Sequence, residues 1–212
     1  MTLAILAIVI SYLVGSIPFA YIFVRLFKGV DIRKEGSGNV GFTNATRVIG
    51  IKLGIIVLLA DMGKGILAVL AISKLGMIQP NALAGYMPVL CGFFAIVGHI
   101  WTIFLKFHGG KGVATSLGVF IAICPIAGLV SLGVWLIIVA ITEYVSVGSI
   151  FMCINFCALT FVLNCSYFIN NINIWAVRIT AILITIIVIF KHTSNIKRLI
   201  RGEERKFGRR EN

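Results

Sequence analysis

The chain carries little charge and very few acidic residues. Lys, Arg, Asp and Glu make up 12% of its 212 residues, and only seven side chains are carboxylates. Because soluble domains carry about 25% charged residues, this composition excludes an ordinary soluble fold. The scarcity of carboxylates also argues against an ion-coupled carrier, which would usually need carboxylates or broken helices at the membrane midplane.

The signatures of several enzyme classes are missing as well. The chain has no Gly-x-Ser-x-Gly, which argues against a hydrolase with a nucleophile elbow, and no His-x-x-x-x-Asp, the pattern of glycerolipid acyltransferases that face the aqueous phase. It also lacks a Cys-x-x-Cys pair and any His, Cys and Asp cluster with metal-ligand spacing, so the sequence predicts no metal and no cofactor. We expect the cysteines to be buried free thiols. They are Cys91, Cys124, Cys153, Cys157 and Cys165.

Apolar residues are abundant, at 59% of the chain with a mean hydropathy of +1.06. A membrane span needs about 20 such residues, and the sequence predicts an all-α integral membrane protein with a single domain over residues 1–212. The apolar stretch 112–142 is too long for one span, and Pro125 divides it because proline clashes with the preceding helical turn. We therefore predict seven transmembrane helices, with six as the alternative. They lie at about residues 3–25, 53–73, 83–104, 112–124, 126–142, 145–165 and 174–191.

The distribution of basic residues predicts the orientation. With an outer N-terminus and seven spans, all but three of the 19 Lys and Arg residues lie on one side, the exceptions being Lys64, Lys74 and Arg178. Loops rich in Lys and Arg face the cytoplasm, so this side, with the C-terminus, is predicted to be cytoplasmic. We attribute the net charge of +12 to these loops and to anionic lipid, since no basic soluble module is present to bind nucleic acid.

Residues 36–47, Gly-Ser-Gly-Asn-Val-Gly-Phe-Thr-Asn-Ala-Thr-Arg, form the first of three polar segments on that side. Glycines let backbone N–H groups approach a ligand, successive N–H groups form an anion-binding nest, and the Arg47 guanidinium matches phosphate oxygens. The spacing Gly36-x-Gly38-x-x-Gly41 matches a dinucleotide fingerprint, but a membrane span rather than a strand precedes it. The alternative to a phosphate site is a turn with capping Asn and Thr residues.

The second polar segment covers residues 98–115. Three of its glycines, Gly109, Gly110 and Gly112, form a connection between two spans that opens directly into an apolar helix. A helix N-terminus favours phosphate. Lys111 adds a positive charge there. The segment is not a Walker A loop, because it lacks the required Gly before the Gly-Lys pair and the Ser or Thr after it. The alternative is a glycine-rich loop whose lysine only marks the cytoplasmic side.

The third polar segment covers residues 191–198. His192 and Asn195 are three residues apart and share one helical face. A His at a membrane boundary is more often a polar cap than a catalyst, but its position opposite two anion-binding loops favours a functional role. Ser146 and Ser149 begin another span on the same side, where serines often only cap a helix.

Asp61 and Lys64 lie inside the second predicted span at helical spacing. Charges inside a membrane are costly and tend to pair, facing the interior of the bundle. We interpret the two residues as a structural ion pair, and whether they touch substrate stays open.

Together the three segments resemble one family, the bacterial acyl-phosphate:glycerol-3-phosphate acyltransferases, or PlsY family. The resemblance covers the whole chain in order. The matching residues are Gly36-Ser37-Gly38-Asn39-Val40-Gly41-x-Thr43-Asn44-x-x-Arg47, Gly98-His99, Gly109-Gly110-Lys111-Gly112-Val113-Ala114-Thr115, His192, Asn195 and Gly202-Glu203-x-x-x-Phe207-Gly208.

The resemblance implies an enzyme of the bacterial cytoplasmic membrane with its active site facing the cytoplasm. It would transfer a fatty acyl group from acyl phosphate to the 1-hydroxyl of glycerol 3-phosphate, giving lysophosphatidic acid and phosphate. Because acyl phosphate is already an activated mixed anhydride, no acyl-enzyme intermediate is required. The implied partners are these two substrates and membrane lipid. The oligomeric state is open, with a monomer expected.

The residue chemistry and the resemblance together assign roles. Catalytic roles are predicted for Ser37, Arg47, Lys111, His192 and Asn195. Substrate-binding roles are predicted for Gly36, Gly38, Asn39, Thr43, Asn44, Gly109, Gly110, Gly112 and Ser149. We expect the catalytic residues other than Ser37 to bind glycerol phosphate, and Ser37, Asn39 and the first segment to cradle the acyl phosphate. His192 is a candidate general base, a role that a substrate phosphate oxygen would also fill. The alternative function is a transporter or binding protein for a phosphorylated solute.

Overall fold

The computed structural model describes residues 1–78, 82–165, 169 and 171–207, and its elements in these ranges are all helical. This confirms the predicted all-α class for the described residues. The α-helices are α1 (Thr2–Ser16), α2 (Phe19–Lys28), α3 (Phe42–Leu67), α4 (Ser73–Met77), α5 (Met87–Ile100), α6 (Val113–Ile123), α7 (Pro125–Thr142), α8 (Val145–Val162), α9 (Ile174–Lys191) and α10 (Thr193–Ile200). Shorter turns of helix are η1 (Ile32–Lys34), the π-helical η2 (Ala68–Ile72), η3 (Ala84–Tyr86) and η4 (Ile103–Leu105).

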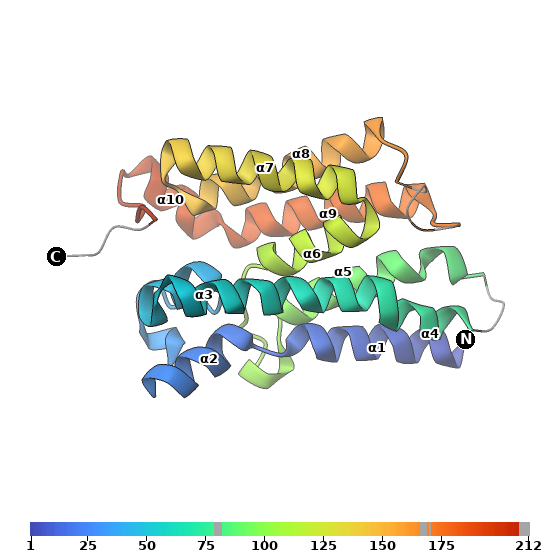
Figure 1. Cartoon of the computed structure of the whole chain (residues 1–212), viewed down its shortest axis with the longest axis horizontal. Helices are drawn as coiled ribbons and strands as arrows, with labels where there is room; N and C mark the ends of the chain where they lie inside the picture. Colours follow the sequence, from blue (N-terminus) through green and yellow to red (C-terminus); the bar gives the residue numbers. More distant parts are fainter. Residues whose placement is uncertain (79–81, 166–168, 170, 208–212) are drawn as a thin grey trace.

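The long helices lie side by side along one axis, as Figure 1 shows. Helix α1 packs on α5, α3 packs on α6, and α8 packs on both α7 and α9. Helix α6 contacts α3, α5, α7 and α9 and so joins the two groups of helices. The largest cluster of buried apolar side chains surrounds it, with the Phe120 ring stacked on that of Phe156 at a centroid distance of 3.7 Å.

Six helical segments in the described part of the chain are long and apolar enough to cross a membrane. They are Thr2–Lys28, Phe42–Met77, Ala84–Leu105, Pro125–Thr142, Val145–Val162 and Ile174–Lys191. The fourth predicted span corresponds to α6, which has only 11 residues. At 1.5 Å per residue it is about 16 Å long, roughly half of a hydrocarbon core. Residues 115–120 of α6 are all buried, so protein rather than lipid surrounds it there.

Proline interrupts the apolar stretches at two places. The predicted division at Pro125 is confirmed, since α6 ends at Ile123 and α7 begins at Pro125. The span predicted for residues 3–25 corresponds to the segment Thr2–Lys28, but its helix is interrupted, because α1 ends at Ser16 and α2 begins after Pro18. Proline has no N–H to donate and disfavours the helical conformation in the residue before it, so the chain changes course at Pro18.

Helix α3 begins earlier than the span predicted for residues 53–73. It starts at Phe42, so the end of the first polar segment is helical rather than part of a loop. The helix propensity of the residues at this start is weak. The Asn44 side chain forms hydrogen bonds with the preceding loop. Non-helical angles at Gly50 (φ 83°) put a kink between this first part and the membrane-spanning part of α3.

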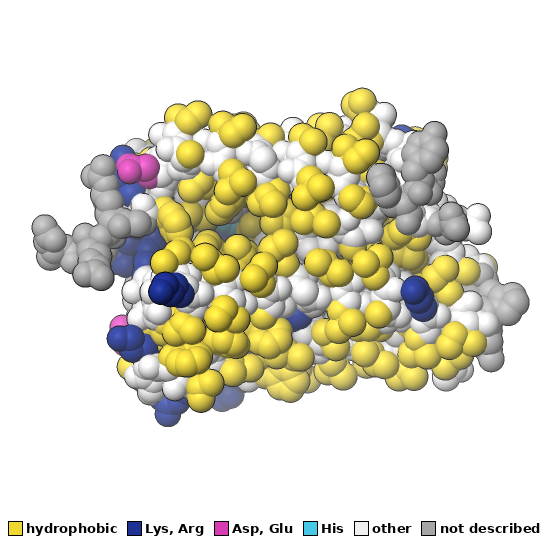
Figure 2. Space-filling view, in the orientation of Figure 1, with side chains coloured by type: hydrophobic (Ala, Val, Ile, Leu, Met, Phe, Trp, Pro, Cys, Tyr) yellow, Lys and Arg dark blue, Asp and Glu magenta, His cyan; other side chains and the backbone are white. Residues whose placement is uncertain are grey.

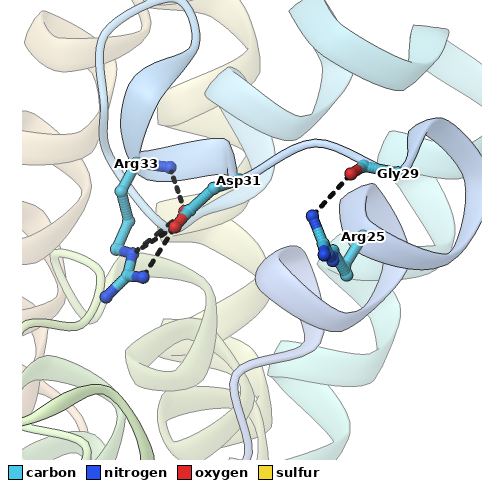
Figure 3. A network of polar contacts seen from close by, with 4 residues as sticks. All are labelled: Arg25, Gly29, Asp31 and Arg33. Carbon is cyan, nitrogen blue, oxygen red and sulfur yellow. Dashed lines mark hydrogen bonds and ion pairs between the residues drawn. The ribbon is translucent and has the colours of Figure 1, made fainter.

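Charged side chains gather at one end of the molecule, at the left in Figure 2, while apolar side chains cover the middle. The connection between α2 and α3 at this end is held by local polar contacts (Figure 3). Arg25 donates to the carbonyl oxygen of Gly29, and Arg33 pairs with the Asp31 carboxylate at 2.6 Å. The three polar segments lie at the same end of the bundle.

Candidate functional site

A cavity of about 570 Å³ opens at the charged end of the bundle. All three polar segments line it, together with apolar residues of α6, α7 and α8. One wall is therefore polar and basic and another is apolar. Such a cavity is suited to a ligand that joins an anionic group to an apolar chain.

Four helices begin at this cavity, namely α3, α6, α8 and α10, and residues of the first turn of each line it. Within the described residues, none of these four N-termini has a side-chain cap. The first N–H groups of a helix have no partner inside the helix, and the macrodipole adds about half a positive charge. The cavity thus collects N–H groups from several helix starts, an arrangement that binds phosphate.

The first polar segment is shaped by Asn44, which is 1% exposed. Its amide nitrogen donates to the carbonyl oxygens of Ile32 and Glu35, at 3.2 and 2.9 Å, and its side-chain oxygen accepts from the Ser37 N–H at 2.9 Å. Gly36 has a φ of +55°, and a Cβ there would lie 2.3 Å from the Asn44 side-chain oxygen. Only glycine fits at this position, and the turn directs Ser37 and Gly38 to the cavity.

Lys111 and Asn195 bring the second and third segments together. The Lys111 ammonium donates to the side-chain oxygen of Asn195 across the cavity. Burial lowers the pKa of Lys111 to about 8, with the nearby cations Arg198 and Arg47 adding to the effect and Glu204 opposing it. The lysine is mainly charged at neutral pH, and a bound phosphate would stabilise that charge further.

His192 is held in one orientation at the junction of α9 and α10. It is 2% exposed, and its Nδ1 lies 2.7 Å from the carbonyl oxygen of Val188. Burial, with the charge of Lys111, lowers the pKa of His192 to about 4, so the ring is neutral at pH 7. Since a carbonyl oxygen only accepts, Nδ1 carries the proton and Nε2 is left as an acceptor.

The segment after α10 folds back over the cavity. The Glu204 carboxylate accepts from Ser146, Asn195 and Arg198, at 2.9, 2.6 and 2.8 Å. Burial acts to raise the pKa of Glu204, but these hydrogen bonds outweigh it and hold the pKa below its usual value. Arg47, whose side chain is exposed, reaches the same segment and donates to the carbonyl oxygen of Arg205 at 3.5 Å. The tail therefore links three of the helices that begin at the cavity.

The apolar wall comes from helices α6, α7 and α8. Leu117, Leu132, Trp135 and Met152 line it. The Trp135 indole N–H donates to Ser149 Oγ at 3.3 Å, and Ser149 Oγ donates to the Val145 carbonyl oxygen at 2.7 Å. The predicted binding residue Ser149 thus lies where the polar and apolar walls meet. Its hydroxyl proton is donated to the Val145 carbonyl oxygen.

The residues predicted from sequence are brought together. All of the predicted catalytic and substrate-binding residues line the cavity except Gly110, which lines a much smaller adjoining cavity. Further residues line the main cavity for which the sequence predicted no site role, among them His99, Lys191, Arg198, Glu204 and Arg205. His99 belongs to a matched motif, and Glu204 follows the motif residue Glu203. The sequence therefore gave a reason to consider both as site residues. Gly208, the last residue of the matched tail, lies outside the described residues.

The structure contains the predicted pair of intramembrane charges. Lys64 Nζ lies 2.8 Å from Asp61 Oδ1, and the two side chains are 3% and 1% exposed. His99 Nδ1 is 3.5 Å from the same carboxylate oxygen. Because Asp61 and His99 also line the main cavity, the pair lies directly beneath it.

The chain is similar to known proteins over nearly its full length. Residues 5–202 match the family model described as glycerol-3-phosphate acyltransferase. A glycerol-3-phosphate acyltransferase of Thermoanaerobacter sp. (strain X514) is 42% identical over 207 residues, which cover 98% of this chain and 97% of that protein. A protein of the same name from Clostridioides difficile (strain 630) is 42% identical, over 95% of this chain and 94% of that protein.

Two solved structures have the same fold. A crystal structure of PlsY (YgiH), an integral membrane glycerol 3-phosphate acyltransferase in its glycerol 3-phosphate form, matches with a TM-score of 0.82 and 38% identity, covering 97% of this chain and 96% of that one. The lysophosphatidic acid form matches with a TM-score of 0.80 and 37% identity, over 97% and 95% of the two chains.

Proposed function

The chain belongs to the glycerol-3-phosphate acyltransferase family of PlsY, an integral membrane protein, and from that membership we propose its reaction in detail. It transfers a fatty acyl group from acyl phosphate to the 1-hydroxyl of glycerol 3-phosphate, giving lysophosphatidic acid and inorganic phosphate. The observation that carries the proposal is a single cavity with two unlike walls. One wall has several uncapped helix N-termini and basic side chains, and the other is apolar. Two phosphate-bearing substrates, one with an acyl chain, match those walls.

The placement in the membrane is part of the proposal. The chain forms one domain with seven spans, of which α6 is a short one buried among the others, and its N-terminus lies outside. The cavity then faces the cytoplasm of a bacterial cell at its inner membrane. The gathering of Lys and Arg at the cavity end supports this orientation. A monomer suffices, since one chain supplies every wall of the cavity.

The two phosphates take different parts of the polar wall. Arg47, Lys111, His192 and Asn195 bind glycerol 3-phosphate, and Ser37, Asn39 and the N-terminus of α3 cradle the acyl phosphate. The cations and N–H groups offset the repulsion between the two anions. Holding the reactants together in the right geometry supplies roughly 7–11 kcal/mol of the barrier.

The chemical step is a direct acyl transfer. The 1-hydroxyl oxygen of glycerol 3-phosphate attacks the acyl carbonyl carbon, and the bond from that carbon to the phosphate oxygen breaks. The phosphate leaves with the bonding electrons, and helix N–H groups and Lys111 stabilise the negative charge that develops. The neutral His192, whose Nε2 is an acceptor, takes the hydroxyl proton. A phosphate oxygen of the substrate is the alternative acceptor.

The donor is tested with purified protein and no added cofactor. With palmitoyl phosphate and glycerol 3-phosphate we expect equal amounts of lysophosphatidic acid and phosphate, and with palmitoyl-coenzyme A in place of palmitoyl phosphate no product. Phosphate release without acylated product, or acylation from the thioester alone, would contradict the proposed donor. Transport of glycerol 3-phosphate into vesicles without acylation would support the alternative function of a carrier.

The absence of an acyl-enzyme is tested separately. Protein mixed with palmitoyl phosphate alone is examined by intact-mass spectrometry, and we expect its mass to stay unchanged. A covalent palmitoyl adduct that disappears when glycerol 3-phosphate is added would contradict direct transfer. Ser37→Ala and Ser149→Ala then identify the acylated hydroxyl.

A further inference from the structure

We propose that Asp61, Lys64 and His99 are positioning residues that hold the first and second polar segments in register beneath the cavity. The inference rests on the proposed function, because those segments carry the phosphate-binding groups. It assigns to a buried ion pair a role in substrate binding, beyond the stability of the bundle.

Lys64 is the centre of this group. Its ammonium lies 2.8 Å from Asp61 Oδ1 and donates to the carbonyl oxygens of Gly15 and Ile17, at 3.0 and 2.9 Å. Those carbonyls belong to the break between α1 and α2, where the Phe19 N–H donates to Ile17 rather than continuing the helical pattern to Gly15. A buried carbonyl without a partner is costly. Lys64 supplies the donor that the Gly15 carbonyl loses at the break, and it gives the Ile17 carbonyl a second donor.

His99, near the start of the second segment, joins this centre to the glycine loop of that segment. Its Nδ1 lies 3.2 Å from Lys64 Nζ, and its backbone carbonyl accepts from the Gly110 N–H at 3.1 Å. The next carbonyl, that of Ile100, accepts from the Gly109 N–H at 3.1 Å. The loop that carries Lys111 therefore runs directly along the end of α5.

The other side of the His99 ring faces both segments. A Cβ built on Gly110 would lie 2.3 Å from His99 Nε2 and 2.6 Å from the carbonyl oxygen of Val40, which belongs to the first segment. The small adjoining cavity, of about 10 Å³, is lined by Asp61, Lys64, His99, Val40 and Gly110 among others. The three proposed positioning residues, Val40 of the first segment and Gly110 of the second thus meet at one point.

Two readings of the ion pair predict different behaviour. If the pair only stabilises the fold, a folded variant in which both residues are neutral should have the kcat and KM of the wild type. If the pair positions the segments, that variant should be folded but slower. Replacing both partners of a buried pair is often neutral for stability, whereas removing one partner leaves an uncompensated charge. A neutral double variant therefore separates folding from positioning.

The test uses Asp61→Asn/Lys64→Met, which removes both charges and all of the hydrogen bonds that Lys64 donates. We expect a folded protein whose melting temperature is lower than that of the wild type, because the Gly15 carbonyl loses the donor that Lys64 supplies. At a temperature where the variant is folded, kcat/KM for glycerol 3-phosphate should be about 10²-fold lower, since small misplacement of reacting groups has effects of that size. Wild-type kcat/KM in the folded double variant would overturn the proposal. Each single variant is expected to be less stable than the double variant.

A second pair of variants tests His99 without touching the charges. Asn matches the position of Nδ1, so His99→Asn keeps a contact to Lys64 and loses the ring side that faces Val40 and Gly110. Gln matches the position of Nε2. We expect His99→Asn to raise KM for glycerol 3-phosphate about tenfold more than His99→Gln does, and equal KM values in two folded variants would overturn this step.

Arg178→Gln is the matched control for both tests. Arg178 is half-buried at the opposite end of the bundle and donates to the carbonyl oxygen of Thr160 at 3.1 Å, so its loss disturbs packing far from the two segments. We expect its KM to equal that of the wild type. If the wild-type protein shows no turnover, the proposed function fails. The positioning proposal is then judged from glycerol 3-phosphate binding by tryptophan fluorescence, because Trp135 lines the cavity. Binding as tight in the double variant as in the wild type would overturn it.

Discussion

The two ends of the bundle begin their helices differently. At the cavity end, α3, α6, α8 and α10 start without a side-chain cap. At the opposite end, the Asn173 side chain caps α9 by accepting from the Ala176 N–H at 3.0 Å, and α5 and α7 have a proline in the first two positions. Helix α1, at the start of the chain, is the exception there, since it has no side-chain cap. A cap or a proline removes unsatisfied N–H groups from a helix start.

The difference shows where the chain leaves polar groups available. An uncapped helix start at a membrane surface needs a partner, either water or a ligand. Around the cavity, such starts occur beside Lys111 and Arg47, whereas α5, α7 and α9 at the opposite end have a proline or a side-chain cap. The cavity end is therefore built to receive anions, and the predictions below test this distinction, from the largest expected effect to the smallest.

Replacing Lys111 has the largest expected effect. In Lys111→Ala we expect kcat to fall about 10³-fold, because one preorganised group that stabilises developing charge contributes about 10²–10³-fold. Lys52→Ala is the matched control, since Lys52 is exposed on α3 and does not line the cavity. Steady-state rates with both substrates and a melting curve give the comparison. Unchanged turnover in a folded Lys111→Ala protein would remove Lys111 from the site.

His192→Gln tests the general base with a smaller expected effect. Glutamine places a polar atom near the position of Nε2 but does not take a proton at neutral pH, so we expect kcat to fall about 10²-fold with little change in KM. His108→Gln is the control, because His108 is exposed and outside the cavity. If kcat of the folded His192→Gln protein stays within about threefold of the wild type, the proton is transferred to a substrate phosphate oxygen instead.

The alkaline limb of the pH profile is expected from Lys111. Its pKa of about 8 means that the free enzyme loses this charge as the pH rises through that value, so kcat/KM falls about tenfold per unit above it. Arginine keeps its charge in this range. Lys111→Arg should therefore lose the limb even though its absolute rate is lower, and a limb at the same pH in both proteins would assign it to another group.

Much of the fold could be predicted from the sequence, because it follows from apolar runs and their interruptions. Helix α9 spans Ile174–Lys191, the predicted range, since polar residues flank a mainly apolar run in which Arg178 is the one charged residue before Lys191. The division at Pro125 was predictable because proline interrupts an apolar stretch that is too long for one span. The kink at Gly50 and the early start of α3 at Phe42 were not, because they depend on how Asn44 bonds to a loop that precedes it.

The candidate site was also partly predictable. Gly, Asn, Arg and Lys in short polar segments indicated anion binding, and the charge distribution put the segments on one side, where they share a cavity. The sequence did not distinguish Glu203 from Glu204. Which of the two faces the site depends on the turn after α10, where Gly202 has a φ of +70° and the Glu203 N–H donates to Arg198. The turn itself is a Schellman motif that Gly202 favours locally, but the position of Glu204 beyond it depends on contacts with Ser146 and Asn195, which lie on two other parts of the fold.

The smallest expected effect comes from an ion pair at the cavity end that does not line the cavity. Asp31 and Arg33 pair in the connection between α2 and α3 (Figure 3), and hydrogen bonds from Arg33 hold the pKa of Asp31 at about 2. Exposed pairs contribute little to stability, so Asp31→Asn should leave kcat/KM unchanged. Because this pKa lies below its usual value of 3.8, any stabilisation by the carboxylate is present above that pH and is lost as the pH falls toward 2. The difference in melting temperature between wild type and variant should be small at pH 7 and should vanish near pH 2. A loss of turnover as large as that of Lys111→Ala would show that polar groups outside the cavity also carry the function.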